Sequence, residues 1–226
     1  LQSGRGFSTL HFPCEGENHI FKVNSLKKRV HNIKETKKEG LMAIRDILKM
    51  GNPLLREVAA PLTPPFGDDI YQLVEDMRAS LEAVGGVGLA APQIGVSKSL
   101  VIFEVPDDRV QREDGEMAEG VPSTVLINPK IEPLSDEMEL GWEGCLSVPG
   151  LRGLVPRHTH IRYRGLALDG SAIDVEARGF HARVVQHECD HLFGILYPER
   201  MTDMRFLVYE SEVEAFMEGL RQSAAE

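Results

Sequence analysis

The stretch that most constrains the fold of this chain is residues 184–196, which read VVQHECDHLFGIL. It contains a His-Glu-x-x-His pattern, in which His187 and His191 lie four residues apart. On an α-helix, residues at this spacing share one face, so both imidazoles can reach a single metal ion. Glu188 lies beside them, where it can act as a general base on a metal-bound water. The pattern predicts a helix over residues 181–193, with Gly194 at its C-terminal end.

Two histidines do not complete a catalytic metal site, which usually has three protein ligands and an open position for water. A metzincin-type protease would have a third histidine at position 197, which is a tyrosine here. A gluzincin-type protease would use a downstream glutamate, and the candidates, which also fit a solvated helix face, are Glu210, Glu212 and Glu214. The upstream candidate is Cys145, which also fits a small core residue. The residues alone leave the third ligand open.

Strands and one further helix are predicted around this motif. Apolar residues recur at helical spacing over residues 68–84, and this helix would begin at two aspartates and end at two glycines. A turn signal at Asp169-Gly170 predicts a hairpin within the last of the expected strand regions. These regions, rich in β-branched and aromatic residues, are 99–105, 123–134 and 159–179. Strands on either side of a second helix predict an α+β domain.

Charge separates the first forty residues from the rest of the chain. Residues 1–40 carry eight Lys/Arg and four Asp/Glu, a net of +4, so the total of -10 leaves -14 on the remaining 186 residues. We expect a poorly ordered extension over residues 1–40 and a single domain over residues 41–226, for which Met42 fits a native start. An organelle transit peptide is the alternative for the extension, although such segments are usually Arg-rich and poor in acidic residues.

Composition excludes several classes of protein. The net charge of -10 argues against nucleic-acid binding, because phosphate contacts need a basic face. No apolar run approaches the roughly 18 residues of a membrane span. The N-terminal region lacks the apolar core of a secretory signal, so we expect an intracellular protein. Three widely spaced cysteines form no disulfide framework and suit a reducing compartment.

Three short segments together resemble the signature motifs of the peptide deformylases. They are GVGLAAPQIG at 86–95, EGCLSVPG at 143–150 and QHECDHLFG at 186–194, in the order and at the approximate spacing of that family. The similarity extends over about residues 42–198, and three motifs in order are far more specific than any one of them. The resemblance implies an α+β fold with antiparallel β-sheets packed around a central helix that carries the His-Glu-x-x-His motif.

The resemblance also implies a metal centre. Its ligands would be Cys145, His187 and His191, with water at the fourth position. Members of the family use Fe²⁺ naturally, and Zn²⁺, Ni²⁺ or Co²⁺ occur in preparations; the ligand types alone do not choose among these ions. Glu188 is implied as the general base. The Gln93 side-chain amide and the Leu146 backbone N–H are implied as donors to the carbonyl oxygen that gains charge during the reaction.

The implied reaction is removal of the formyl group from the N-terminal formyl-methionine of new polypeptides, with release of formate. Substrate is expected at one backbone-binding residue, Gly88, and at an apolar pocket for the methionine side chain. The implied substrate-binding residues are Val87, Gly88, Gly144, Phe180 and Val184. Arg183 stands at a position that is often apolar in relatives, which leaves the pocket wall there open. A metallopeptidase and a catalytically silent, metal-binding member are the competing hypotheses.

The implied partners are N-formylmethionyl peptides of nascent chains, met transiently near the ribosome. Some bacterial members dock on the ribosome through a basic C-terminal helix, but residues 203–226 are acidic here, which speaks against that route. The implied location is the bacterial cytoplasm, or an organelle matrix if residues 1–40 are a transit peptide.

Four residues near the motifs carry minor expectations. We expect Glu143 and Arg152 to pair and hold the Cys145 loop. Asp190 is expected either to orient a metal-bound histidine or to be a surface charge. Cys189 points away from the two histidines on the helix, so we expect it to pack in the core.

Overall fold

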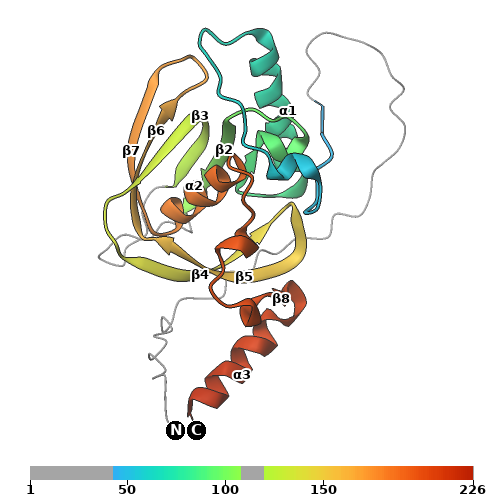
Figure 1. The fold of residues 1–226 in the computed structure, drawn as a ribbon, viewed down its shortest axis with the longest axis vertical. Helices are drawn as coiled ribbons and strands as arrows, with labels where there is room; N and C mark the ends of the chain where they lie inside the picture. The colour runs from blue at the N-terminus through green and yellow to red at the C-terminus, as the bar shows by residue number, and fades with distance from the viewer. Residues whose placement is uncertain (1–42, 108–119, 226) are drawn as a thin grey trace, which may run out of the picture. The chain divides into compact units, whose positions relative to one another are not determined.

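The computed structural model describes residues 43–107 and 120–225, all within the unit Lys38–Glu226. The extension expected over residues 1–40 lies outside the described residues. In the described part, two antiparallel sheets flank the helix α2, as the α+β expectation requires (Figure 1). The helix with the metal motif therefore has strands on both sides. No helix among these residues combines the length and the apolar character needed to cross a membrane.

The elements have the following bounds. The five-stranded sheet, in spatial order, consists of β1 (Gly88–Ala90), β2 (Leu100–Val105), β3 (Val121–Pro133), β6 (His160–Leu166) and β7 (Ala172–Arg178). The three-stranded sheet consists of β4 (Met138–Cys145), β5 (Val148–His158) and β8 (Val208–Tyr209). The α-helices are α1 (Asp68–Val84), α2 (Gly179–His191) and α3 (Val213–Ala225). Short 3-10 helices are η1 (Pro53–Arg56), η2 (Ala91–Ile94), η4 (Tyr197–Arg200), η5 (Met204–Phe206) and η6 (Glu210–Glu212).

The helix predicted over residues 68–84 has these bounds in the structure. Asp68 and Asp69 occupy its first turn, where carboxylates interact favourably with the helix dipole. Gly85 ends it in the left-handed conformation, with φ 68°. Its buried face, which packs on the five-stranded sheet, includes Ile70, Leu73, Val74, Met77 and Leu81.

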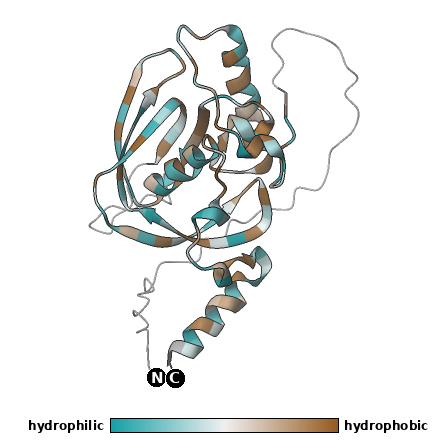
Figure 2. Ribbon diagram, in the orientation of Figure 1, coloured by the Kyte–Doolittle hydropathy of each residue, from teal (hydrophilic) through white to brown (hydrophobic). Residues whose placement is uncertain are grey.

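The predicted strands and hairpin are also confirmed. β2 and β3 cover the regions predicted at 99–105 and 123–134, and β6 pairs with β7 from His160↔Arg178 to Leu166↔Ala172. In the turn, Gly170 has φ 84° and the Asp169 carboxylate accepts from the Ser171 N–H. From Ile173 onward, less exposed apolar residues alternate with exposed polar residues along β7. The same alternation is visible in the ribbon coloured by hydropathy (Figure 2).

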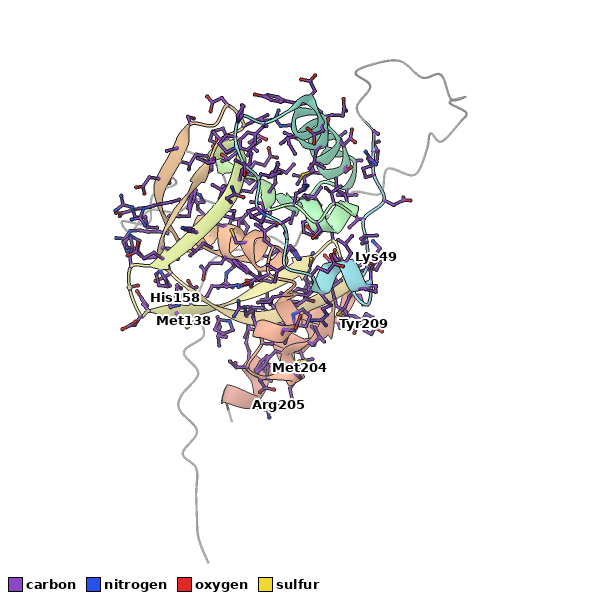
Figure 3. All side chains as sticks on the ribbon, turned by 45° about the horizontal axis from the view of Figure 1, so that its top comes forward. Lys49, Met138, His158, Met204, Arg205 and Tyr209 are labelled. Atoms are coloured by element: carbon purple, nitrogen blue, oxygen red, sulfur yellow. The ribbon has the colours of Figure 1, made fainter. Side chains whose placement is uncertain are left out.

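The segment between η4 and α3 packs beside the three-stranded sheet. Phe216 of α3 contacts the rings of Trp142 and Phe206 edge-on. Met204 and Tyr209 are exposed by 58% and 67% (both are labelled in Figure 3). The tail is thus tied to β4 by aromatic contacts and, through Leu207, to the core cluster that includes Val155 and Tyr197.

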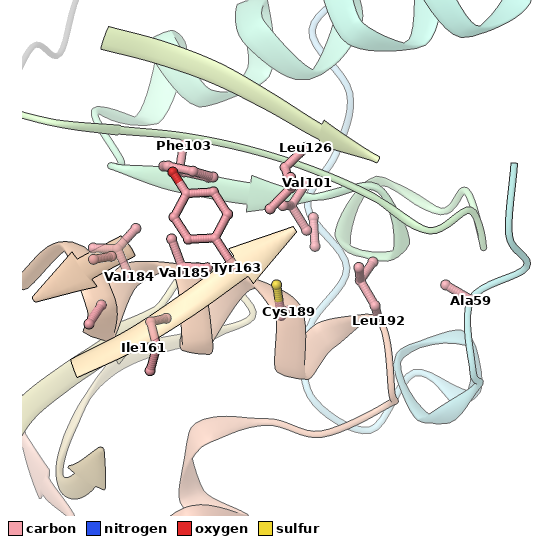
Figure 4. Packing of buried hydrophobic residues seen from close by; sticks show 13 residues of the cluster. Ala59, Val101, Phe103, Leu126, Ile161, Tyr163, Val184, Val185, Cys189 and Leu192 are labelled. Atoms are coloured by element: carbon pink, nitrogen blue, oxygen red, sulfur yellow. The ribbon is translucent and has the colours of Figure 1, made fainter. Parts of the chain in front are cut away.

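The helix α2 passes through the main core. It runs from Gly179 to His191, two residues earlier at each end than predicted, and Gly194 takes the left-handed conformation with φ 71°. A Cβ at Gly194 would collide with the backbone of Arg56, which explains the glycine there. Cys189 is 3% exposed and packs among Tyr163, Leu192 and other buried apolar residues (Figure 4). Its predicted packing role is confirmed.

His181, in the first turns of α2, makes stability depend on pH. Its ring packs against Phe103 and Tyr163, its Nε2 lies 3.2 Å from the Tyr163 hydroxyl oxygen, and burial lowers its pKa from 6.5 to about 4. Below pH 6.5 the unfolded chain binds a proton that the folded protein does not. The free energy of unfolding should therefore fall by about 1–2 kcal/mol between pH 7 and pH 5 from this group. Urea unfolding at both pH values should show this loss reduced in His181→Phe; an equal loss would contradict the assignment.

Candidate metal centre

The structure brings the side chains of Cys145, His187 and His191 together. One potential ligand atom from each lies within 4.8 Å of the others, and Cys145 Sγ is 3.4 Å from His191 Nε2. The two histidines stand one turn apart on α2, and Cys145 is the last residue of β4. A helix and a strand that are distant in sequence thus supply the three groups.

The hairpin turn after β4 positions the Cys145 thiol. Cys145 is the Cα partner of Val148 across a two-residue turn, and the Ser147 N–H points at Sγ from 3.4 Å. Gln93 Nε2 lies 3.5 Å from the same sulfur. Burial alone would raise the pKa of Cys145, but the adjacent His191 and His187 hold this pKa well below the ordinary value. The sulfur is therefore in surroundings that favour the thiolate, the form that binds metals.

A buried carboxylate fixes the orientation of His187. Glu143 Oε2 lies 2.8 Å from His187 Nδ1, which leaves Nε2 for a metal. Arg157 donates two hydrogen bonds to the Glu143 carboxylate, from Nε to Oε1 at 2.9 Å and from Nη2 to Oε2 at 3.0 Å. Although burial opposes ionisation, His187 and Arg157 hold the pKa of Glu143 well below its usual range. An ionised carboxylate at this position orients the imidazole and strengthens it as a ligand.

Glu188 has no such partner. It is 5% exposed, and its Oε2 has no hydrogen-bond partner within the described ranges. A Cβ at Gly88 would collide with the Glu188 carboxyl group, so β1 and α2 approach each other closely at this point. Burial raises the pKa of Glu188 to about 7. A carboxyl group that titrates near neutrality is suited to accept and return a proton.

Gln93 and Leu146 lie beside the thiol. Gln93 is buried; its Oε1 accepts from the Ala90 N–H at 2.8 Å, and its Nε2 donates to Ser147 Oγ at 3.1 Å. Leu146 is in the hairpin turn, and its carbonyl oxygen accepts from Lys49 Nζ at 3.4 Å. The Met50 N–H donates to the Ser147 carbonyl at 2.7 Å, so the chain before η1 supports this turn. Both predicted donors are held in place from two directions.

The residues expected to bind substrate divide into two groups. Val87, Phe180 and Val184 pack together in the core cluster around α2, and Gly88 adjoins Glu188. Gly144 is covered by the Arg152 guanidinium, into which a Cβ at this position would project. The apolar residues are therefore brought together, whereas Gly144 lies against a charged side chain.

The expected pairing of Glu143 with Arg152 is wrong. Glu143 bonds to Arg157, and Arg152 Nη2 instead donates to Glu210 Oε1 at 2.5 Å. The register of β4 with β5 explains the difference, because Glu143 faces Gly153. Arg152 therefore points to the opposite side of the sheet, while Arg157, four residues after Gly153, shares the side of Glu143.

The structure also decides the remaining alternatives. Asp190 neither orients a metal-site histidine nor faces solvent: it is buried and accepts from Arg157 Nη1 and Arg200 Nη2, both at 2.6 Å. Among the described residues, the downstream glutamates are absent from the cluster that could hold a metal ion. The guanidinium of Arg183, the residue that left the pocket wall open, donates to Glu143.

The contact of Glu143 with His187, and the whole role of Arg157, were not predicted from the sequence. One signal for Glu143 was present, because residues two apart on a strand point to the same side. A carboxylate two residues before a cysteine ligand can thus face the helix that carries the histidines. Arg157 gave no comparable local signal.

The donor set fits a divalent transition-metal ion. A thiol whose pKa is lowered and two imidazoles are N and S donors of the kind that such ions prefer. Glu143 and Cys145 raise the pKa of His187 against the effect of burial, so an ion that binds there would displace a proton. Three protein ligands would leave a position for water or substrate.

Comparisons with known proteins agree with this geometry. Residues 44–206 match the sequence profile described as polypeptide deformylase. The chain is 58% identical over 161 residues to peptide deformylase 1 of Bordetella pertussis, covering 71% of this chain and 89% of the relative. It is 52% identical over 182 residues to peptide deformylase 2 of Pseudomonas putida, covering 80% and 98%.

Solved structures give the same result. A class I type b peptide deformylase from Acinetobacter baumannii with Met-Ala-Ser bound has a TM-score of 0.64 and 38% identity, covering 71% of this chain and all of that one (100%). The peptide deformylase of Thermotoga maritima has a TM-score of 0.62 and 32% identity, covering 71% and 99%. The chain therefore belongs to the polypeptide deformylase family, the metal-dependent hydrolases that remove the N-formyl group from the formyl-methionine of newly made polypeptides and release formate.

Proposed function

We propose that Cys145, His187 and His191 hold the catalytic ion of this deformylase and that Glu188 carries the proton of the reaction. One observation carries the proposal: all three sequence motifs meet at one point. Gly88 of the first motif touches Glu188 of the third, and Cys145 of the second lies against His191 of the third and Gln93 of the first. Glu188, a buried carboxyl group whose Oε2 has no hydrogen-bond partner among the described residues, adjoins this cluster, and this supports its role in proton transfer.

The chain's own groups divide the chemistry of hydrolysis between them. A divalent ion held by the three side chains would supply Lewis acidity and would lower the pKa of a bound water. Glu188 accepts the proton of the attacking water and returns it to the amine as the formyl C–N bond breaks. Its burial keeps the carboxyl group free of competing partners and near the pKa at which both transfers are favourable.

Gln93 and Leu146 stabilise the oxygen of the formyl group. As the carbonyl carbon becomes tetrahedral, this oxygen gains negative charge and needs donors that are already in place. The Gln93 amide is fixed by Ala90 and Ser147, and its remaining N–H points towards Cys145 Sγ at the long distance of 3.5 Å. That N–H is the one available to substrate. The Leu146 N–H lies in the turn that directly follows Cys145.

The substrate is a peptide that begins with formyl-methionine. Gly88 offers backbone hydrogen bonds, and the methionine side chain lies against the apolar group formed by Val87, Phe180 and Val184, with Gly144 alongside. The Met-Ala-Ser complex of the Acinetobacter baumannii relative supports a methionine-first peptide. We place the catalytic domain at residues 41–226 and its action in the bacterial cytoplasm, on nascent chains close to the ribosome. The exposed glutamates of α3 do not fit a docking role on RNA.

The ion that we propose for the native enzyme is Fe²⁺. The donor set accepts several divalent ions, so Zn²⁺, Ni²⁺ or Co²⁺ can replace iron in preparations. A thiolate beside ferrous iron is vulnerable to oxygen, because it can be oxidised to sulfenic and higher acids. The metal must therefore be studied without air.

The proposed function predicts which bond is cut. Iron-loaded protein, prepared anaerobically and incubated with formyl-Met-Ala-Ser, should release formate and leave the Met-Ala-Ser peptide intact. Mass spectrometry of the peptide and a formate assay measure both outcomes in one reaction. Cleavage within Met-Ala-Ser would favour the metallopeptidase hypothesis, and stoichiometric metal without any product would favour a silent member.

A further inference from the structure

Arg183 of α2 makes contacts that the deformylase reaction does not by itself require. It stands one helical turn before His187, so both side chains leave the helix on the same face. Its Nη1 donates to Glu143 Oε1 at 3.0 Å and to the Val155 carbonyl at 2.8 Å, and its Nη2 donates to the Glu139 carbonyl at 2.8 Å. One guanidinium thus binds α2 to both β4 and β5.

The backbone of β4 is shaped to receive this group. A Cβ at Gly141 would lie 2.5 Å from Arg183 Cζ and 2.6 Å from its Nη2, so only glycine leaves room for the guanidinium. The acceptors in Glu139 and Glu143 lie on either side of Gly141, along the strand that ends at Cys145. The backbone of β4 around Gly141 and the guanidinium of Arg183 are therefore complementary in shape and in hydrogen bonding.

Charge neutralisation alone does not explain Arg183. Glu143 already has a buried partner in Arg157, which binds both of its carboxylate oxygens. The side chain of Arg183 is only 12% exposed, and burying a second guanidinium is unfavourable unless its donors are well matched. What Arg183 adds is a rigid, many-point connection between the helix and the hairpin.

We propose that Arg183 is a positioning residue of the metal centre. It sets the separation between α2, which carries His187 and His191, and β4, which carries Cys145, and it holds Glu143 against His187. The inference rests on the ligand set of the proposed function. Its consequence is that Arg183 governs metal affinity without touching the metal or the substrate.

The test measures metal affinity directly. Arg183→Met keeps the side-chain length and removes the donors, and Co²⁺ should bind about 10–100-fold more weakly to it in competition with a chelator. The visible absorption of the bound Co²⁺ should also change, because the ligands are no longer held at one separation. Gly141→Ala keeps Arg183 but places a methyl group where the guanidinium lies, so it should have the same effects. It serves as the second variant if Arg183→Met fails to fold.

Arg200→Met is the matched control. This substitution removes the same charge, but within the described residues the hydrogen bonds of Arg200 go to Asp190. Its side chain is 46% exposed, so the affinity for Co²⁺ should stay within about threefold of wild type. Urea unfolding of the metal-free proteins distinguishes a role in stability alone from a role in positioning the metal ligands. If Arg183→Met and Gly141→Ala unfold more easily but bind Co²⁺ as tightly as wild type, the inference is wrong.

A failure of the ligand set would look different. In that case Cys145→Ala would bind Co²⁺ as tightly as wild type, whatever the behaviour of Arg183→Met. Loss of binding in Cys145→Ala together with unchanged binding in Arg183→Met and Gly141→Ala would leave the ligand set intact and overturn only the role of Arg183.

Discussion

Replacing Glu188 by glutamine is expected to lower the rate of formate release by at least about 100-fold while metal content and fold are retained. Glutamine has the size of glutamate but cannot accept a proton from water. No ion pair is lost, because the carboxyl group has none and its Oε2 has no hydrogen-bond partner among the residues described. The measurements are kcat/KM for formyl-Met-Ala-Ser and metal per chain by atomic emission.

The glutamine variant should also be no less stable than wild type. Burial raises the pKa of Glu188 to about 7, which means that the folded protein disfavours the charged form relative to the unfolded chain. A neutral amide avoids this cost. Glu214→Gln, the same change on the exposed surface of α3, is the control and should leave formate release unchanged. Formate release near the wild-type rate in Glu188→Gln would mean that another group carries the proton.

The parts of this enzyme that could be predicted from sequence are those set by local spacing. Two histidines four residues apart need only a helix to share an ion, and α2 supplies it. The helix α1 was likewise predictable, because its apolar spacing and its terminal aspartates and glycines are all local signals. The hairpin of β6 and β7 follows from a two-residue turn signal.

The strands β4 and β5 gave weaker signals. Gly141, Gly144, Gly150 and Gly153 interrupt the pattern of β-branched and aromatic residues that identifies a strand. The structure explains three of these glycines by side chains that cover them: the Arg183 guanidinium lies on Gly141, that of Arg152 on Gly144, and the side chains of Met201 and Tyr197 on Gly153. Such glycines are required by a side chain that is distant in sequence, and a local sequence pattern does not show which side chain that is.

The partners of Glu143 could not be predicted for a related reason. They depend on the register between β4 and β5, which shifts between the pairs Glu143↔Gly153 and Cys145↔Val148. This irregularity decides that Arg157, and not the nearer Arg152, shares a side of the sheet with Glu143. The support of the Cys145 turn by Met50 is equally long-range. The sequence motifs therefore predicted the candidate metal ligands, whereas the contacts that position these side chains became visible only in the fold.

Replacing Cys145 by alanine is expected to remove metal and activity together, in contrast to Glu188→Gln. Two imidazoles alone hold a divalent ion poorly, and the Lewis acidity that would be lost is worth several kcal/mol, or about 1,000-fold in rate. Cys189→Ala is the matched control, because Cys189 is buried in the apolar core and absent from the cluster around the metal site. It should lower the free energy of unfolding but keep one metal ion per chain, measured by atomic emission. Full metal occupancy in Cys145→Ala would mean that another residue is the third ligand. A local disturbance of the turn after β4 could only weaken metal binding, so it could not explain that result.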